Sequence, residues 1–355
     1  MEHLQHFGLA EDPFRNEPRL RDFIDSPASR EALARLDRGL RQNKGLLVLT
    51  GAVGCGKTMV VRRLLDQLEE EVFEASMLVV LNGSADANWL LASFARQLGI
   101  ETLAEGREAL LAQVYEQLSI VREDGRHAVL LIDDAHALAA SGALADVCGL
   151  LKLEYEERRL FSLVLAGGPE LETAIAADPT LSRRVEIKVC MPALDATAAS
   201  DYLSQRVSAA GGDPTILESG AVEALRARSG GLPGLMNTLA DNALFGAFLA
   251  GRQRVSEADV TRAHDELGWA GGPSPAGEPA ADEAEATLEV KAPPQVDLDA
   301  TILLTETHDG LNGAPGDLDS ELDAVFAATG SNGLPIDGPP KDDDEEDLVA
   351  TLLED

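Results

Sequence analysis

The chain has 355 residues, 45% of them hydrophobic, and a formal net charge of −33. This apolar content is enough for a sizeable core, and the length allows two or three domains, or one large domain with a tail. The charge disfavours binding of the whole chain to nucleic acid or an anionic membrane, because both need clustered Lys and Arg. Residues 271–355 hold 22 acidic and 2 basic side chains, so the argument is weaker for residues 1–270, whose net charge is −13.

The three cysteines, Cys55, Cys148 and Cys190, are too few and too widely spaced for a disulfide framework or a zinc ligand set, and they suit a reducing cytosol. The N-terminal residues lack the basic start and apolar run of a signal peptide. No apolar stretch reaches the ~18 residues that a membrane span needs. We therefore expect a cytoplasmic protein without a membrane span.

Residues 1–44 are expected to form a lead-in that ends in a helix from about Ser29. An α/β domain is expected over residues 45–193, because short apolar runs typical of buried parallel strands alternate there with helical segments. The predicted strands are 46–49, 77–81, 129–132, 161–165 and 185–189, and the predicted helices are 58–71, 87–98, 105–122, 138–157 and 169–177. Trp89 and Phe94 are expected in the core.

The strand signals stop after the α/β domain. Helices predicted at 195–210, 217–229, 235–250 and 256–267 indicate a small helical domain over residues 194–268. Residues 269–355 are rich in proline and acid, and beyond Trp269 they hold one aromatic, Phe326, which predicts a disordered acidic tail. Segment 297–304 resembles segment 347–353, with a looser copy at 317–322, so the tail either docks protein partners through these repeats or reflects compositional chance.

The strongest motif is residues 51–58, Gly-Ala-Val-Gly-Cys-Gly-Lys-Thr, which fits G-x-x-x-x-G-K-[ST] between a predicted strand and a predicted helix. Such a loop points its backbone N–H groups at phosphate oxygens, and the helix N-terminus adds positive potential. Lys57 is expected to reach the β- and γ-phosphates and Thr58 to ligate Mg²⁺. The expected nucleotide-binding residues are Gly51, Val53, Gly54, Cys55, Gly56, Lys57, Thr58 and Met59.

The position of Cys55 at a helix N-terminus predicts a lowered thiol pKa, although a small side chain tolerated there is the favoured interpretation. A second motif, residues 129–136, reads Val-Leu-Leu-Ile-Asp-Asp-Ala-His, a buried strand that ends in two carboxylates. Asp133 is expected to hold Mg²⁺ through water. Asp134 lies where many P-loop ATPases carry the Glu that activates the attacking water, and it is one methylene shorter. His136 either reports on the γ-phosphate or simply packs.

Taken together, these motifs resemble the ExeA-like AAA+ ATPases of bacterial secretion and pilus-assembly gene sets, which are related to helper ATPases of transposition. The resemblance covers about residues 5–268. It is carried by Phe-Gly-Leu at 7–9, Asp-Pro-Phe at 12–14, Ser-Arg-Glu-Ala-Leu at 29–33, Leu-Thr-Gly at 49–51, Leu-Ile-Asp-Asp-Ala-His at 131–136, Gly-Pro-Glu-Leu at 168–171 and Ser-Gly-Gly-Leu-Pro at 229–233.

The resemblance implies a P-loop α/β domain with a helical lid, Mg-ATP held between them, and homo-oligomers. It also implies that Arg184, with Arg183 beside it, completes the site of a neighbouring subunit. Lys57, Asp134 and Arg184 are therefore the expected catalytic residues, and Thr58 and Asp133 are the expected metal ligands.

The sequence departs from the family pattern in groups that promote hydrolysis. Asp134 replaces a Glu, Gly168 stands where the family often has a Gln, and Gly234 stands where it usually has a lid arginine. These departures predict a slow ATPase or a nucleotide-operated switch. The acidic tail also takes the place of a membrane span and a periplasmic domain, so pore insertion through the cell wall does not carry over.

We therefore expect a low-turnover ATPase that self-associates and acts on protein partners through its lid and tail. Its process would be the assembly or remodelling of an envelope, secretion, pilus or motility complex. One alternative is a scaffold or switch that binds nucleotide and hydrolyses almost none. A second alternative is a DNA-acting helper like the transposition relatives, although no clear basic stripe supports it.

Overall fold

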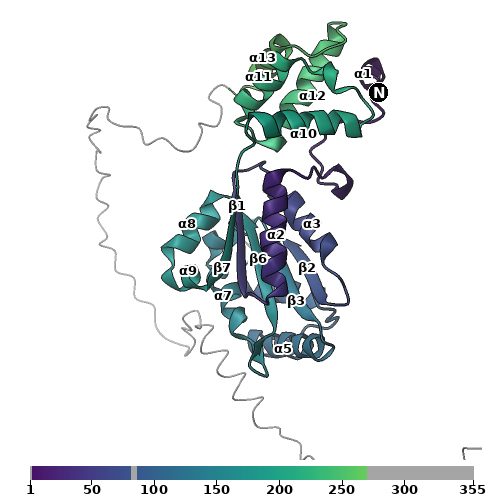
Figure 1. The fold of residues 1–355 in the computed structure, drawn as a ribbon. Helices are drawn as coiled ribbons and strands as arrows, with labels where there is room; N and C mark the ends of the chain where they lie inside the picture. The colour runs from purple at the N-terminus through teal and green to yellow at the C-terminus, as the bar shows by residue number, and fades with distance from the viewer. Residues whose placement is uncertain (1, 81–85, 270–355) are drawn as a thin grey trace, which may run out of the picture. The chain divides into compact units, whose positions relative to one another are not determined.

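A computed structural model of the chain describes residues 2–80 and 86–269 (Figure 1). Its centre is a five-stranded parallel sheet with the strand order β2-β3-β6-β1-β7. The strands are β1 (Leu46–Gly51), β2 (Phe73–Val79), β3 (His127–Asp133), β6 (Phe161–Gly167) and β7 (Val185–Met191). Each of the predicted apolar runs therefore forms a strand, although β2 begins and ends before the expected 77–81.

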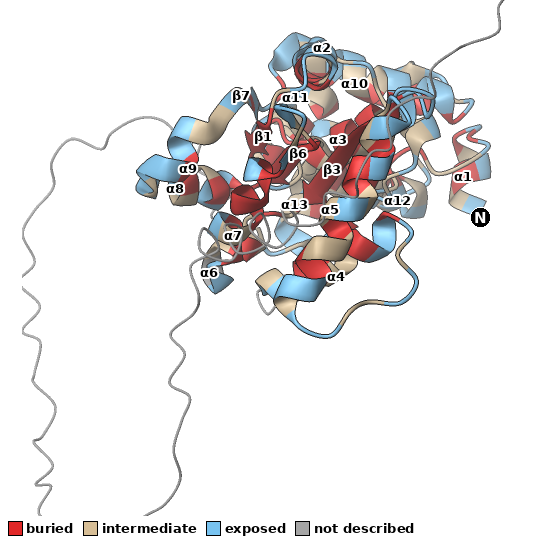
Figure 2. Cartoon of the chain, turned by 90° about the horizontal axis from the view of Figure 1, so that it is seen from below, coloured by how far each residue is buried: buried red, intermediate tan, exposed pale blue. Residues whose placement is uncertain are grey.

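Helices cover both faces of this sheet, so the side chains of β1, β3 and β6 are buried along their whole length (Figure 2). Helices α2 (Pro27–Arg41) and α3 (Lys57–Gln67) share one core cluster with alternate residues of β1, β3 and β6. The other residues of these strands point to the opposite face. There α4 (Ala87–Gln97) places Phe94 against Phe161, and α5 (Arg107–Glu123) and α8 (Pro169–Ala177) complete the layer.

Two predictions about this domain are wrong. Segment 138–157 is not one helix but α6 (Ala137–Ser141), α7 (Ala143–Gly149), a 3-10 turn at Leu150–Lys152 and a hairpin of β4 (Glu154–Tyr155) and β5 (Arg158–Arg159). Gly142 separates α6 from α7 with a φ of 76°, and the hairpin turns through Glu156 and Glu157, both left-handed, as tight hairpins require. Trp89 is 42% exposed, because it lies outside the buried face of α4.

A helical bundle follows the sheet. It contains α10 (Ala196–Ala209), η3 (Pro214–Ile216), α11 (Ser219–Ser229), α12 (Pro233–Leu249) and α13 (Glu257–Glu266). Side-chain caps set the helix starts, as Asp195 accepts a hydrogen bond from Ala198 N and Ser256 forms a capping box with Asp259. The four predicted helices are present within about two residues at each end.

The lead-in contributes to this bundle rather than standing apart. Besides α2 it contains α1 (Glu2–His6) and η1 (Leu20–Asp22), and its residues Leu4, Phe7, Leu9 and Phe14 belong to the hydrophobic core of the bundle. The chain therefore starts in the bundle and crosses to the sheet at α2. A short helix α9 (Pro179–Arg184) leads into β7.

The acidic tail predicted for 269–355 lies outside the described residues from residue 270 on, and so do its repeated segments. In the ranges that the structure describes, no helix combines the length and the apolar character needed to cross a bilayer.

Candidate functional site

The loop between β1 and α3 has the backbone conformation of a phosphate cradle. Gly54 and Gly56 have φ values of 83° and 99°, which side-chain-bearing residues rarely adopt. A Cβ atom at Gly51 would lie 2.7 Å from Cys55 Sγ and 2.8 Å from the carbonyl oxygen of Met191. The loop therefore needs glycine at all three positions to curl back onto the N-terminus of α3, where unpaired N–H groups gather.

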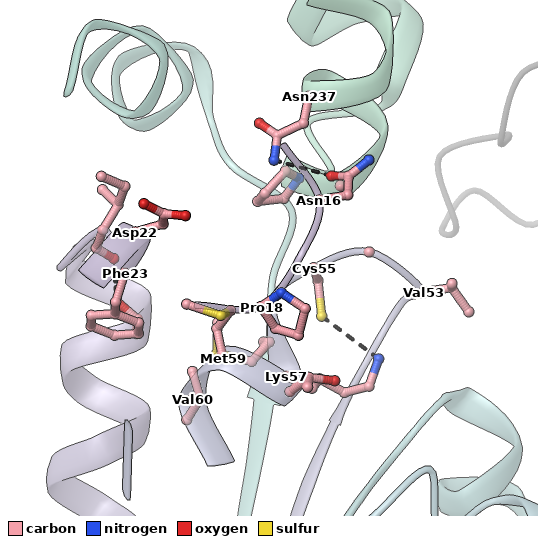
Figure 3. Close-up of a pocket in the computed structure, with 18 of the residues that line it drawn as sticks. Asn16, Pro18, Asp22, Phe23, Val53, Cys55, Lys57, Met59, Val60 and Asn237 are labelled. Atoms are coloured by element: carbon pink, nitrogen blue, oxygen red, sulfur yellow. Dashed lines mark hydrogen bonds between the residues drawn. The ribbon is translucent and has the colours of Figure 1, made fainter. Parts of the chain in front are cut away.

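Lys57 is buried at the start of α3 and its ammonium is held by the loop. Nζ donates hydrogen bonds to the carbonyl oxygens of Gly51 and Ala52, each at 2.9 Å. Its Nζ also lies 3.9 Å from Cys55 Sγ (Figure 3). Burial raises the pKa of the Cys55 thiol although Lys57 opposes this, so the prediction of a lowered pKa is wrong.

The end of β3 brings Asp133 to the loop. Asp133 is 2% exposed, and burial is the main cause that raises its pKa; a hydrogen bond with the Thr58 side chain opposes this effect. The two predicted metal ligands therefore lie near each other. Two oxygen donors of this kind, one of them a buried carboxylate that forms no ion pair with the described residues, fit Mg²⁺.

Asp134 has a left-handed backbone with a φ of 55°, which Asp tolerates better than most residues. Its N–H donates to Asp133 Oδ1 at 3.1 Å, and its own Oδ1 lies 4.0 Å from His136 Nδ1. The Asp134 side chain is 50% exposed, so its carboxylate is open to water. Asp134 and His136 form one side of a cavity, together with Gly168 at the end of β6.

This cavity has a volume of about 320 Å³ and joins the loop to distant parts of the chain. The loop residues that line it are Val53, Gly54, Cys55, Gly56, Lys57, Thr58 and Met59. The lead-in forms the facing wall through Asn16, Pro18, Asp22 and Phe23, and the bundle contributes Leu194, Tyr202 and Asn237 (Figure 3). The structure therefore brings together most of the predicted site, with Gly51 and Asp133 directly behind it.

Sequence reasoning missed the lead-in wall and the residue that fixes it. Arg206 of α10 is 7% exposed and donates to the carbonyl oxygens of Pro13 at 2.6 Å, Arg15 at 2.7 Å and Asp22 at 3.3 Å. The sequence does contain one hint of this role. Arg206 falls on the same face of α10 as the buried residues Ala199, Leu203 and Val207. No acidic side chain pairs with its guanidinium in the described residues, so main-chain carbonyls satisfy this buried cation.

The N-terminus of α12 touches the phosphate loop directly. Gly234 N donates to the carbonyl oxygen of Gly54 at 2.9 Å. A Cβ atom at Gly234 would lie 3.1 Å from Gly54 Cα. The glycine that stands in place of a lid arginine thus permits a backbone contact that a larger residue would push apart.

Arg184 lies elsewhere, at the end of α9, and does not line the cavity of its own chain. Its guanidinium donates to the carbonyl oxygen of Cys148. The neighbouring Arg183 is exposed. Within one chain, the structure therefore separates Arg184 from the other predicted catalytic residues.

Comparisons with known proteins agree with this fold and site. Residues 40–175 match the family described as AAA domain. The chain is 32% identical over 266 residues to General secretion pathway protein A of Aeromonas hydrophila, a match that covers 74% of this chain and 48% of that protein. This chain therefore spans about half the length of that curated relative.

Solved structures with a similar fold include the ORC2 protein of Aeropyrum pernix in its ADPNP-ADP complexes, with a TM-score of 0.56 at 17% identity over 73% of this chain and 72% of that one. Cdc6p of Pyrobaculum aerophilum has a TM-score of 0.54 at 19% identity, over 73% and 72% of the two chains. These likenesses bear on the fold alone. The match to the AAA domain family and the identity to General secretion pathway protein A show that this chain belongs to the ExeA-like AAA+ family.

Proposed function

We propose that the chain binds Mg-ATP and hydrolyses it slowly. The observation that carries this proposal is the joint placement of Lys57, Thr58 and Asp133 around one glycine-rich loop at the mouth of a cavity. Lys57 now donates to two loop carbonyls, and phosphate oxygens would take over these hydrogen bonds. The exchange replaces neutral acceptors with charged ones, which strengthens each bond.

Mg²⁺, when bound, would neutralise charge on the terminal phosphates. Thr58 Oγ1 and the Asp133 carboxylate would hold it, and the interaction of the Thr58 side chain with Asp133 supports this assignment. Asp134 would hold a water molecule for attack from the open side of the cavity, where its carboxylate is half exposed.

Three features support a low rate. The Asp134 side chain is short, Gly168 supplies no side chain at the end of β6, and Gly234 brings a backbone N–H to the loop where a cation would stabilise the transition state. Each change removes a group that would act on the transferred phosphate. The ligands that bind the nucleotide are intact, so binding and turnover are expected to diverge.

Self-association would supply the positively charged side chain that Gly234 does not provide beside the terminal phosphate. The finger role of Arg184 requires the side chain to leave the Cys148 carbonyl and enter the site of a neighbouring chain. Arg183 is already exposed and is the alternative donor. Through such an oligomer the chain would act on protein partners. The likeness to General secretion pathway protein A supports an envelope or secretion complex as the setting.

The test is to measure ATP affinity and steady-state hydrolysis on the same preparations of the full chain. Lys57→Ala should abolish both, and Asp134→Asn should abolish hydrolysis alone. Arg184→Ala should lower turnover by roughly 100-fold or more without changing the affinity of one chain for ATP, because a finger acts in the transition state. Arg183→Ala is the matched variant, and an effect there in place of Arg184 would reassign the finger.

Gly168 and Gly234 also favour a second candidate, a scaffold that uses ATP as a structural ligand. Asp134→Glu separates the two functions. If the wild type turns over slowly and Asp134→Glu accelerates it, the short side chain limits an active ATPase. Tight ATP binding without turnover in the wild type and in Asp134→Glu would refute the ATPase and leave the scaffold.

A further inference from the structure

Part of the cavity beside the phosphate loop is lined by apolar side chains. Phe23 and Pro18 of the lead-in, Met59 of α3 and Leu194 line it. Figure 3 shows Phe23 and Met59 facing the same space, with Pro18 between Met59 and Cys55. A purine ring has two apolar faces and a polar edge, so this surface suits the base of a nucleotide whose phosphates occupy the loop.

Beside these apolar side chains, one buried polar atom has no hydrogen-bond partner in the part of the chain that the structure describes. Asp22 Oδ2 is buried and unpaired among the described residues. The nearest cation to the other oxygen, Oδ1, is Arg21 Nε at 3.8 Å, which is too long for a hydrogen bond. Figure 3 shows the carboxylate directed into the cavity. An acceptor that is desolvated in this way is costly until a donor reaches it.

The backbone holds this carboxylate in place. Asp22 ends η1, and its main-chain carbonyl accepts a hydrogen bond from Arg206 at 3.3 Å. The side chain is therefore presented by a segment anchored to the bundle, and it does not sit on a free loop. A fixed acceptor discriminates between ligands by the group they bring to it.

We infer that Asp22 reads the 6-position of the purine, accepting a hydrogen bond from the 6-amino group of adenine. This inference rests on the proposed nucleotide function and adds the base that the site selects. A 6-oxo purine, placed in the same way by its phosphates, would bring a carbonyl oxygen against the carboxylate. Both groups are acceptors, so neither would be satisfied.

The experiment compares equilibrium affinities for ATP, purine riboside 5′-triphosphate and ITP, with Mg²⁺ present. The second ligand lacks any 6-substituent and the third carries a 6-oxo group. The wild type should bind ATP about tenfold more tightly than the unsubstituted purine, and ITP more weakly still. Equal affinity of the wild type for ATP and the unsubstituted purine would overturn the inference, and this comparison needs no variant.

Two variants sharpen the result. Asp22→Ala should reduce the preference for ATP over the unsubstituted purine to about twofold or less, since the acceptor is gone. Asp22→Asn should improve ITP binding relative to ATP, because its amide can donate to the 6-oxo group. Asp25→Asn is the matched control, since Asp25 lies in the same segment, is largely exposed and pairs with Arg30. A preference that survives in Asp22→Ala would refute the assignment.

The outcomes separate this inference from the function on which it rests. If the wild type binds none of the three triphosphates, the proposed nucleotide function fails and Asp22 with it. If it binds all three alike and Lys57→Ala abolishes binding, the nucleotide function stands and the role of Asp22 alone is refuted.

Discussion

Replacing Arg206 with Met should detach the lead-in from the bundle and weaken nucleotide binding. The guanidinium makes two short hydrogen bonds, at 2.6 and 2.7 Å, and a longer one at 3.3 Å, all to main-chain carbonyls of the lead-in. A hydrogen bond to a charged group contributes about 1.5–3 kcal/mol, so the two short bonds together contribute about 3–6 kcal/mol. Water can reach part of the freed backbone, and we therefore expect a loss near 3 kcal/mol.

The loss can be measured in the bundle itself. The chain has two tryptophans, and Trp269 packs against the bundle core whereas Trp89 is exposed on α4. In a Trp89→Phe background, urea unfolding followed by Trp269 fluorescence reports the free energy of unfolding of the bundle. Arg206→Lys is the control, because an ammonium keeps the charge but does not span three carbonyls. It should lose about half as much.

The same variant should bind ATP at least tenfold more weakly, because the released segment carries the cavity wall that includes Asp22 and Phe23. A destabilisation below about 1 kcal/mol with unchanged ATP affinity would refute the reasoning, since a single lost hydrogen bond already accounts for that much. It would mean that the apolar contacts of Phe7, Leu9 and Phe14 hold the lead-in without Arg206.

Two further predictions test the packing at the sheet and the bundle. Gly234→Ala should lower the melting temperature, because its Cβ would lie 3.1 Å from Gly54 Cα. Gly246→Ala on the same helix meets nothing within 4 Å and should stabilise the chain by about 1 kcal/mol. Shifts of the melting temperature in the same direction for both variants would contradict this reasoning. Burial lowers the pKa of His127 from 6.5 to about 4, so the stability from its neutral ring is present above pH 6.5 and is lost as the pH falls towards 4. Urea unfolding should show a loss of about 2 kcal/mol from pH 7 to pH 5, and His127→Gln should remove that component; an equal loss in the variant would refute it.

The sheet and the phosphate loop were predictable from sequence because their signals are local. Strands covered on both faces read as apolar runs, and the loop needs glycine at positions that the motif itself fixes. The same reasoning failed at residues 138–157. There a left-handed glycine and a hairpin with two left-handed Glu residues interrupt a pattern of apolar spacing that fits a helix equally well.

The far wall of the cavity was not predictable, because it depends on contacts between distant segments. Arg206 binds residues more than 180 positions away, and Phe7 and Phe14 pack into a core formed after residue 194. Nothing in the local sequence of the lead-in says which domain it joins. Asp22 Oδ2 likewise has no hydrogen-bond partner among the described residues, so only the surrounding cavity indicates a role for it.

Gly234 lacks the side chain of a lid arginine, but its backbone still contacts the phosphate loop. Sequence comparison reads it as the loss of an arginine that would touch the phosphates. In the structure its N–H instead donates to the Gly54 carbonyl oxygen, and a Cβ atom there would lie 3.1 Å from Gly54 Cα. An arginine at 234 would first have to push α12 away from the loop, which removes the hydrogen bond that now joins them. We therefore expect a cationic side chain at 234 to weaken the contact between the bundle and the phosphate loop.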